Sequence, residues 1–230
     1  MLIVFVLAAV VTVIAGMAME VLLPAGLPDA VVNAIFAPLT LATLGLTTVA
    51  WVAARHRGAV RRLVGRRPRL GDALVGLGAG VLGVVVITAG VGLAIALVLD
   101  LLGRDIPAVQ QHLRDAARDP QTAPILVFSA LVVAPIAEEL FFRGFVFPAL
   151  VKRVGLWAGI VLSALIFGFV HLNQTEDLLG GALLLARLVP LGMLFAWLYH
   201  WRGTLVIPII VHAVFNAASV ALLLTGLGQG

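Results

Sequence analysis

The chain has 230 residues, of which 62% are hydrophobic and only 11% are charged. A soluble globular domain usually carries about a quarter charged residues, so this composition excludes an ordinary soluble fold and indicates a protein of the lipid bilayer. Cysteine is absent, which excludes disulfides, cysteine–zinc sites and a cysteine nucleophile. The net charge of +4 is typical of basic cytoplasmic loops beside anionic lipid, and we expect no nucleic-acid partner.

The apolar residues fall into seven stretches that are long for soluble core helices, and about 20 apolar residues are enough to cross a bilayer. In chain order they lie near residues 2–23, 31–54, 73–101, 123–149, 156–173, 181–200 and 204–226. The first stretch lacks a basic start and a small-residue cleavage site, so we expect a retained span and not a signal peptide. The predicted fold class is therefore all-α, a polytopic transmembrane bundle of about seven helices.

The charged loops predict how the bundle is oriented. The loop after the second stretch holds seven of the fifteen basic residues: Arg55, Arg57, Arg61, Arg62, Arg66, Arg67 and Arg69. Because basic loops stay in the cytoplasm, the N-terminus is predicted to be cytoplasmic, with a prokaryotic plasma membrane as the expected location. Lys152, Arg153 and Arg202 fall on the same side. We expect the arginine run to orient and anchor the protein, and Gly76 and Gly80 to let helices pack closely.

Ionisable groups inside a membrane are costly and usually functional. The back half of the chain carries six such ionisable or amide side chains: Glu138, Glu139, Arg143, His171, His212 and Asn216. At about 1.5 Å per residue, Glu138, His171 and His212 lie roughly 18, 22 and 12 Å from the inner ends of their helices. Three helices are thus predicted to bring one acid and two imidazoles to the middle of the membrane.

The spacing of these residues divides their roles. Glu139 and Arg143 are four residues apart, so they share a helix face and can form an ion pair. Glu138 lies about 100° around the helix, which leaves it the freer carboxylate and the better candidate for a general base. His212 and Asn216 are also four apart, and together they could donate hydrogen bonds to a developing oxyanion.

Two prolines and one further arginine accompany these residues. Pro135 and Pro208 each remove a backbone donor and should kink their helices, although prolines are common in transmembrane helices for structural reasons. Arg187 in the sixth stretch could bind a substrate carboxylate. Pairing with Glu176 or Asp177 is the interpretation that we favour for it.

At this point the sequence resembles a known family. Three motifs of that family, EExxxR, FxxxH and HxxxN, occur here in the same order. They are EELFFR (Glu138 to Arg143), FGFVH (Phe167 to His171) and HAVFN (His212 to Asn216). These motifs are similar to those of the CAAX prenyl protease and bacteriocin-processing (CPBP, or Abi) intramembrane proteases, over roughly residues 120–220. The resemblance implies a catalytic transmembrane core at 121–226, preceded at 1–120 by N-terminal transmembrane helices and the basic loop.

The resemblance also implies roles for the motif residues. Glu138 would activate the attacking water with help from His171, while His212 and Asn216 would line an oxyanion hole. Arg143 would hold the glutamate pair, with Glu139 in support. The reaction would be endoproteolysis of a membrane-embedded or lipidated substrate, as in the removal of the last three residues of prenylated CAAX proteins.

Several alternatives stay open. Glu138, His171 and His212 could hold a zinc ion, and the family is often described as a metalloprotease, although we favour a cofactor-free reaction because HExxH spacing is absent. A proton-coupled transporter could use the same groups as a relay. A catalytically silent scaffold or immunity protein could keep the same fold. The sequence predicts neither the substrate nor the oligomeric state.

Overall fold

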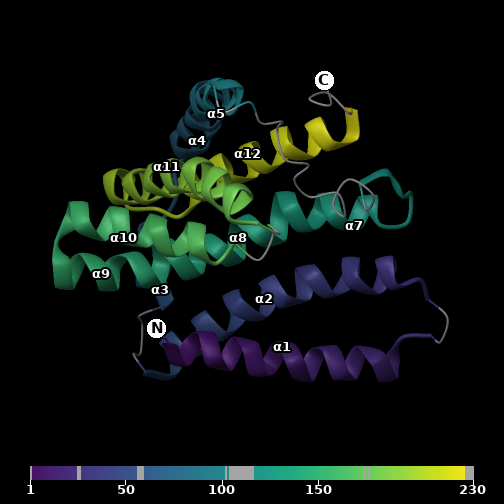
Figure 1. Ribbon diagram of the computed structural model, residues 1–230. Helices are drawn as coiled ribbons and strands as arrows, with labels where there is room; N and C mark the ends of the chain where they lie inside the picture. Colours follow the sequence, from purple (N-terminus) through teal and green to yellow (C-terminus); the bar gives the residue numbers. More distant parts are fainter. Residues whose placement is uncertain are drawn as a thin grey trace.

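The computed structural model describes residues 2–24, 27–55, 60–101, 103, 117–172, 175 and 177–225, and this part of the chain is almost entirely helical (Figure 1). The α-helices are α1 (Leu2–Leu22), α2 (Asp29–Arg55), α3 (Val60–Val64), α4 (Leu70–Gly83), α5 (Gly90–Leu101), α7 (Ala123–Phe128), α8 (Ala134–Glu139), α9 (Phe147–Val154), α10 (Leu156–Phe169), α11 (Leu178–Arg202) and α12 (Val206–Thr225). Three π-helical segments lie within the longer helical rods: η1 (Val84–Ala89), η2 (Ser129–Val133) and η3 (Leu140–Val146). The all-α membrane bundle is therefore confirmed.

The helices occur at the seven positions that the sequence predicts, but their lengths differ. Among the described residues, five helical rods are long and apolar enough to cross a membrane: 29–55, 70–101, 123–154, 178–202 and 206–225. The expectation that the fifth helix reaches residue 173 is wrong, because α10 ends at Phe169 and has only 14 residues. A helix of that length measures about 21 Å, which is shorter than the roughly 30 Å hydrocarbon core.

The helices pack in layers around the rod formed by α7, η2, α8, η3 and α9. Figure 1 shows α1 and α2 as a pair on one side of this rod, and α11 and α12 on the other side, with α4 and α5 beyond them. Gly45 of α2 lies against Ala137 of α8, where an added Cβ would come within 3.2 Å of the Ala137 Cα atom. This close approach places α2 directly against the helix that carries the two glutamates.

Glycines also bring α4 against α12, in keeping with the close helix packing expected of Gly76 and Gly80. A Cβ atom added at Gly76 would lie 2.9 Å from the Ile210 Cβ, and one added at Gly80 would lie 2.9 Å from the Val214 Cβ. The spacing of four residues puts both glycines on one face of α4, so the two helices meet with little side chain between them. The N-terminal helices thus cover the helix that carries the HxxxN motif.

The arginine-rich loop is fastened to the turn between α11 and α12. The Asp72 carboxylate is fully buried and accepts hydrogen bonds from both terminal nitrogens of Arg66, at 2.8 and 2.6 Å, and from Nη2 of Arg202 at 3.2 Å. This hydrogen bonding raises the pKa of the Arg66 guanidinium. At Gly65, whose φ is +80°, an added Cβ atom would clash with the Gly203 carbonyl oxygen, so the two backbones lie in contact. We call the trio of Arg66, Asp72 and Arg202 the loop clamp.

Candidate active site

The centre of the candidate site is a buried ion pair within one helical rod. Nη1 of Arg143 donates to Oε1 of Glu139 at 3.0 Å, and both side chains are fully buried. The pairing that the spacing of four residues predicts is therefore confirmed. Because both charges are removed from water, the pair is favourable only if further contacts satisfy the remaining polar atoms.

Arg143 finds part of these contacts around it, while its Nε and Oε2 of Glu139 have no hydrogen-bond partner among the described residues. Its Nη2 donates to the backbone carbonyl of Gly192 at 3.1 Å. Its Cζ atom lies 4.6 Å from the ring centroid of Phe167, 4.9 Å from that of Phe195 and 5.7 Å from that of Phe142. Aromatic faces carry partial negative charge and attract a cation, so three rings and one carbonyl hold the guanidinium in place. We call these three phenylalanines the aromatic box.

His171 does not lie within a helix, because it sits in the turn that follows α10. Its backbone N–H donates to the Gly168 carbonyl at 3.1 Å, which leaves the Phe167 carbonyl without the helical partner that it would otherwise have. The ring Nδ1 of His171 takes that place at 2.6 Å. A carbonyl oxygen only accepts, so Nδ1 carries hydrogen and the neutral ring presents a free lone pair at Nε2. The four-residue spacing of the FxxxH motif allows this cap.

The free Nε2 of His171 faces Glu138. It lies 3.7 Å from Oε2 of that carboxylate, which is longer than a direct hydrogen bond. Among the described residues this Oε2 atom is buried and has no hydrogen-bond partner. An ionised carboxylate and a neutral imidazole nitrogen both accept, so the pair needs a hydrogen from elsewhere: an added proton, or a molecule with two donors such as water.

His212 contacts the other glutamate. Its Nδ1 lies 3.1 Å from Oε1 of Glu139, the same oxygen that accepts from Arg143. The imidazole ring stacks on Phe195 with a centroid distance of 5.1 Å and an interplanar angle of 25°. Since the carboxylate accepts, Nδ1 of His212 carries the hydrogen, and Nε2 is the atom left for other partners.

Asn216 is tied to the backbone of the helical rod. Its Nδ2 donates to the Ala130 carbonyl at 2.7 Å. In the π-helical segment η2 the backbone N–H of residue i bonds to the carbonyl of residue i−5, as Ala134 does with Ser129. The next donor in that pattern would be residue 135, which is proline and has no N–H. The Asn216 amide therefore supplies the hydrogen bond that Pro135 cannot make, and its second N–H has no partner among the residues that the structure describes.

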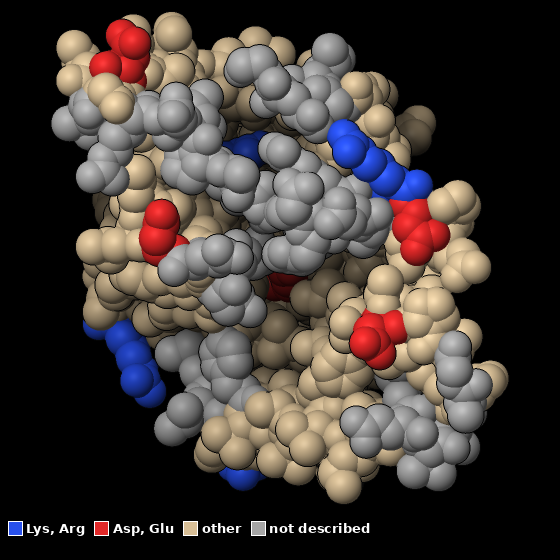
Figure 2. Space-filling view, turned by 45° about the vertical axis from the view of Figure 1, so that its right-hand side comes forward, with Lys and Arg blue, Asp and Glu red and all other residues tan. Residues whose placement is uncertain are grey.

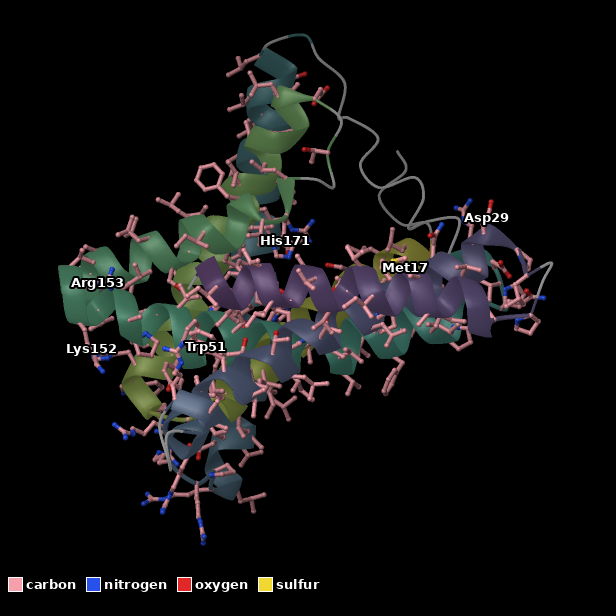
Figure 3. The ribbon with its side chains drawn as sticks, turned by 90° about the horizontal axis from the view of Figure 1, so that it is seen from below. Met17, Asp29, Trp51, Lys152, Arg153 and His171 are labelled. Carbon is pink, nitrogen blue, oxygen red and sulfur yellow. The ribbon has the colours of Figure 1, made fainter. Side chains whose placement is uncertain are left out.

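The site lies in the interior of the molecule, between its two ends. In Figure 3 His171 is near the middle, with Lys152 and Arg153 toward one end and Asp29 at the other. Figure 2 shows the face turned forward as hollowed, with an acidic side chain and a basic side chain recessed below the surrounding surface. Glu138, Glu139, Arg143 and His212 are all buried, while His171 and Asn216 are half-buried. The cluster is therefore least buried at His171 and Asn216.

Of the two partners expected for Arg187 the structure describes only Asp177, and it adds site residues that the sequence does not reveal. Arg187 makes no ion pair with Asp177: it contacts Oγ of Ser219 at 3.4 Å, and the Asp177 carboxylate caps α11 at the Gly180 N–H. Glu176, its other expected partner, lies outside the described residues. The carbonyls of Gly192 and Ala130 are site atoms that no sequence motif marks, since every residue has a carbonyl.

The predicted zinc ligands do not form a metal site in this arrangement. Within the described ranges, no three His, Asp or Glu side chains are close enough together to hold a metal ion. Glu138 and His171 face each other, but His212 points its Nδ1 at Glu139. The donor set therefore does not fit a three-ligand zinc centre, and no step below is routed through a metal.

Comparison with known proteins finds a family model that matches the part of the chain that carries this cluster. Residues 120–218 match the model of the Rce1-like family, described as type II CAAX prenyl endopeptidase Rce1-like. The chain is 31% identical over 96 residues to the Bacillus subtilis (strain 168) protein named "Putative membrane peptidase YdiL", which covers 42% of this chain and 36% of that protein. It is 30% identical over 97 residues to "Uncharacterized protein YpbD" of the same organism, over 42% of this chain and 44% of that protein. The chain thus covers less than half of either relative, and no solved structure matches it.

Proposed function

We propose that this integral membrane protein is an intramembrane endopeptidase, because residues 120–218 match the type II CAAX prenyl endopeptidase (Rce1-like) model and carry the motifs that resemble those of the CPBP family. Its substrate would be a membrane-associated peptide, with prenylated CAAX-type peptides as the first class to test. One observation carries the proposal: the unpartnered Glu138 carboxylate oxygen lies 3.7 Å from the free Nε2 of His171, at the half-buried edge of the site.

A water molecule fits this pair chemically. Water has two hydrogens, and it can donate one to the Glu138 carboxylate and the other to Nε2 of His171. Its oxygen lone pairs are then free to attack a peptide carbonyl. Glu138 takes one proton as the new C–O bond forms, which makes it the general base, and His171 orients the water.

The net charge of the cluster suggests which groups stabilise the negative oxygen of the tetrahedral intermediate. Glu138 and Glu139 contribute −2 and Arg143 contributes +1, so one further proton makes the buried cluster neutral, which a low-dielectric site favours. With that proton on His212, Nδ1–H donates to Glu139 and Nε2–H is free to donate. The imidazolium can then stabilise the negative oxygen of the tetrahedral intermediate, joined by the free N–H of Asn216.

The remaining steps balance without an added reactant. The proton on Glu138 passes to the nitrogen of the scissile bond as the C–N bond breaks, which releases an amine and leaves a new carboxylic acid. Glu139 and Arg143 act as positioning residues in this scheme. They contact each other, His212 and the aromatic box. They thereby hold His212, which donates a hydrogen bond to the oxyanion, in place.

The test is cleavage of a farnesylated CAAX peptide, and of a membrane-peptide library, by the full chain purified in detergent, with products identified by mass. Glu138→Ala and His171→Ala should each lower kcat by roughly 10²–10⁴-fold, the range for losing a general base or its partner. Asp29→Ala, an exposed change at the far end of the molecule, is the matched control. If the folded Glu138 and His171 variants cleave normally, the scheme is wrong.

Two further measurements separate the alternatives. Cleavage that persists in strong chelators supports the cofactor-free scheme, and its loss, with recovery on adding zinc, supports the metal alternative. Proton flux through liposomes without any cleavage would favour a transporter. A folded protein with neither activity would favour a silent scaffold or immunity protein.

We also propose that the arginine-rich loop and the N-terminus face the cytoplasm of a prokaryotic cell. The support is the concentration of basic residues in that loop. The loop clamp joins this loop to the turn after α11, so Arg202 would lie on the same side.

A further inference from the structure

Arg187 is a charged group inside a membrane-spanning helix that the scheme above does not use. It lies in the middle of α11 and is half-buried. Its hydrogen-bonded contact is a long one, from Nη2 to Oγ of Ser219 at 3.4 Å. Among the described residues, no carboxylate lies within ion-pair distance of it. Glu176 lies outside the described residues, and none of the described carboxylates offsets the cost of this guanidinium in a spanning helix, which makes Arg187 a candidate functional group.

The contact with Ser219 places Arg187 on the reactive face of α12. His212, Asn216 and Ser219 are spaced by four and three residues, so they form one stripe along this helix. On α11, Arg187 and Phe195 are eight residues apart, which is about 80° beyond two full turns. Phe195 stacks on His212, and Arg187 contacts Ser219. Because α11 and α12 are antiparallel, they contact each other at two heights. Phe195 meets His212 beside the catalytic residues, and Arg187 meets Ser219 farther along.

The separation of these two levels can be worked out from helix geometry. Seven residues of α12 rise about 10.5 Å, and eight residues of α11 rise about 12 Å. An extended peptide covers about 3.3–3.6 Å per residue, so about three residues span the same distance. A peptide with its scissile bond beside Glu138 and His212 could place a group three residues farther along next to Arg187.

We propose that Arg187 binds the free C-terminal carboxylate of the substrate and thereby selects peptides cleaved about three residues from their end. This inference rests on the proposed endopeptidase function. The guanidinium offers parallel N–H donors that match a carboxylate, and a charged pair in this half-buried place is stronger than one in water. Ser219 would hold the side chain until the substrate replaces or joins its contact.

The test compares two farnesylated peptides of one sequence, one ending in a carboxylate and the other in a carboxamide. Binding is measured by fluorescence anisotropy to the full chain in nanodiscs, in a Glu138→Gln background that does not cleave. We expect the acid to bind at least about tenfold more tightly than the amide, or about 1.4 kcal/mol. Arg187→Gln should bring the acid down to the affinity of the amide and leave the amide unchanged, while Arg187→Lys should keep part of the preference.

The result that overturns the inference is equal behaviour of acid and amide with Arg187 intact, including no measurable binding of either. It is also overturned if Arg187→Gln keeps the preference. If the arginine is a structural partner of Glu176, then Glu176→Gln and Arg187→Gln lower Tm alike and neither alters the ratio, which again refutes carboxylate binding. Should the glutamine variant fail to fold, the ratio in the unchanged protein and in Arg187→Lys decides.

Failure of this inference is distinguishable from failure of the proposed function. An arginine-dependent preference for the acid without any cleavage by the wild-type chain would refute the endopeptidase and keep the carboxylate site. Cleavage of acid and amide at equal kcat/KM would keep the endopeptidase and refute the site. With both correct, the mass of the released product gives a fragment of about three residues.

Discussion

The Ala130 carbonyl accepts a hydrogen bond from Asn216. One substitution can remove this side-chain donor, and a second can supply a backbone N–H in its place. Asn216→Ala deletes the side-chain donor, which lies 2.7 Å from the carbonyl. Pro135→Ala supplies a backbone N–H at the residue that η2 leaves without a donor. If Asn216 is there to satisfy this carbonyl, the second change should compensate for the first.

The magnitude follows from the burial of the two partners. An acceptor left unsatisfied costs about 1–3 kcal/mol, and side-chain hydrogen bonds between membrane helices average about 0.6 and reach about 1.7 kcal/mol. Both Asn216 and Ala130 are half-buried, so we expect about 1 kcal/mol for Asn216→Ala. For a chain of this size that corresponds to a fall in Tm of roughly 2–4 °C.

The assay is a double-mutant cycle on four proteins: wild type, Asn216→Ala, Pro135→Ala and the double variant. Thermal unfolding in detergent gives stability, and cleavage of the farnesylated peptide gives activity. We expect a coupling of about 1 kcal/mol, which is large enough to exceed the usual error of additivity. Strictly additive changes in Tm would refute the assignment. If Tm recovers in the double variant and cleavage does not, Asn216 also acts on the oxyanion through its free N–H.

Three other predictions concern the loop clamp, the α4–α12 contact and the orientation of the chain. Asp72→Ala should lower Tm more than Asp29→Ala, because it leaves two guanidinium groups without their shared carboxylate; equal values in thermal unfolding would argue against a clamp. Gly80→Leu should destabilise by about 1–3 kcal/mol, since its Cβ would already lie 2.9 Å from that of Val214, and unfolding in detergent measures it. The chain lacks cysteine, so Arg67→Cys and Asp29→Cys each create a unique label; we expect an impermeant thiol reagent outside the cell to reach residue 29 and not residue 67.

The parts of the fold that the sequence predicts well are those set by local periodicity. The positions of the seven helices follow from apolar length, and the Glu139–Arg143 pair follows from helical spacing. The same holds for Gly76 and Gly80, whose shared face is visible in their spacing. Each of these depends on residues within one or two turns of each other.

The parts that the sequence does not predict depend on backbone atoms or on distant segments. His171 lies in a turn because α10 stops at Phe169, and an apolar sequence does not mark where a helix ends inside the membrane. The partner of Asn216 is a carbonyl 86 residues away, which no side-chain pattern reveals. The role of Asp72 was not predicted either, because a single acid after an arginine run is typical of an ordinary loop. Its partner Arg202 is distant in the sequence and contacts it only in the folded chain.

The aromatic box has a consequence for how the protein responds to its surroundings. Salt screens exposed charges over about 8–10 Å, but it acts far less on buried ones. Arg143 is enclosed by rings and fully buried, whereas the side chains of Arg66 and Arg202 are about one-third exposed, at 33% and 31%. Rising ionic strength should therefore weaken the attachment of the arginine-rich loop long before it alters the charges that surround Glu138. The same contrast applies to anionic lipids, which can compete for the clamp arginines and cannot reach the guanidinium at the centre.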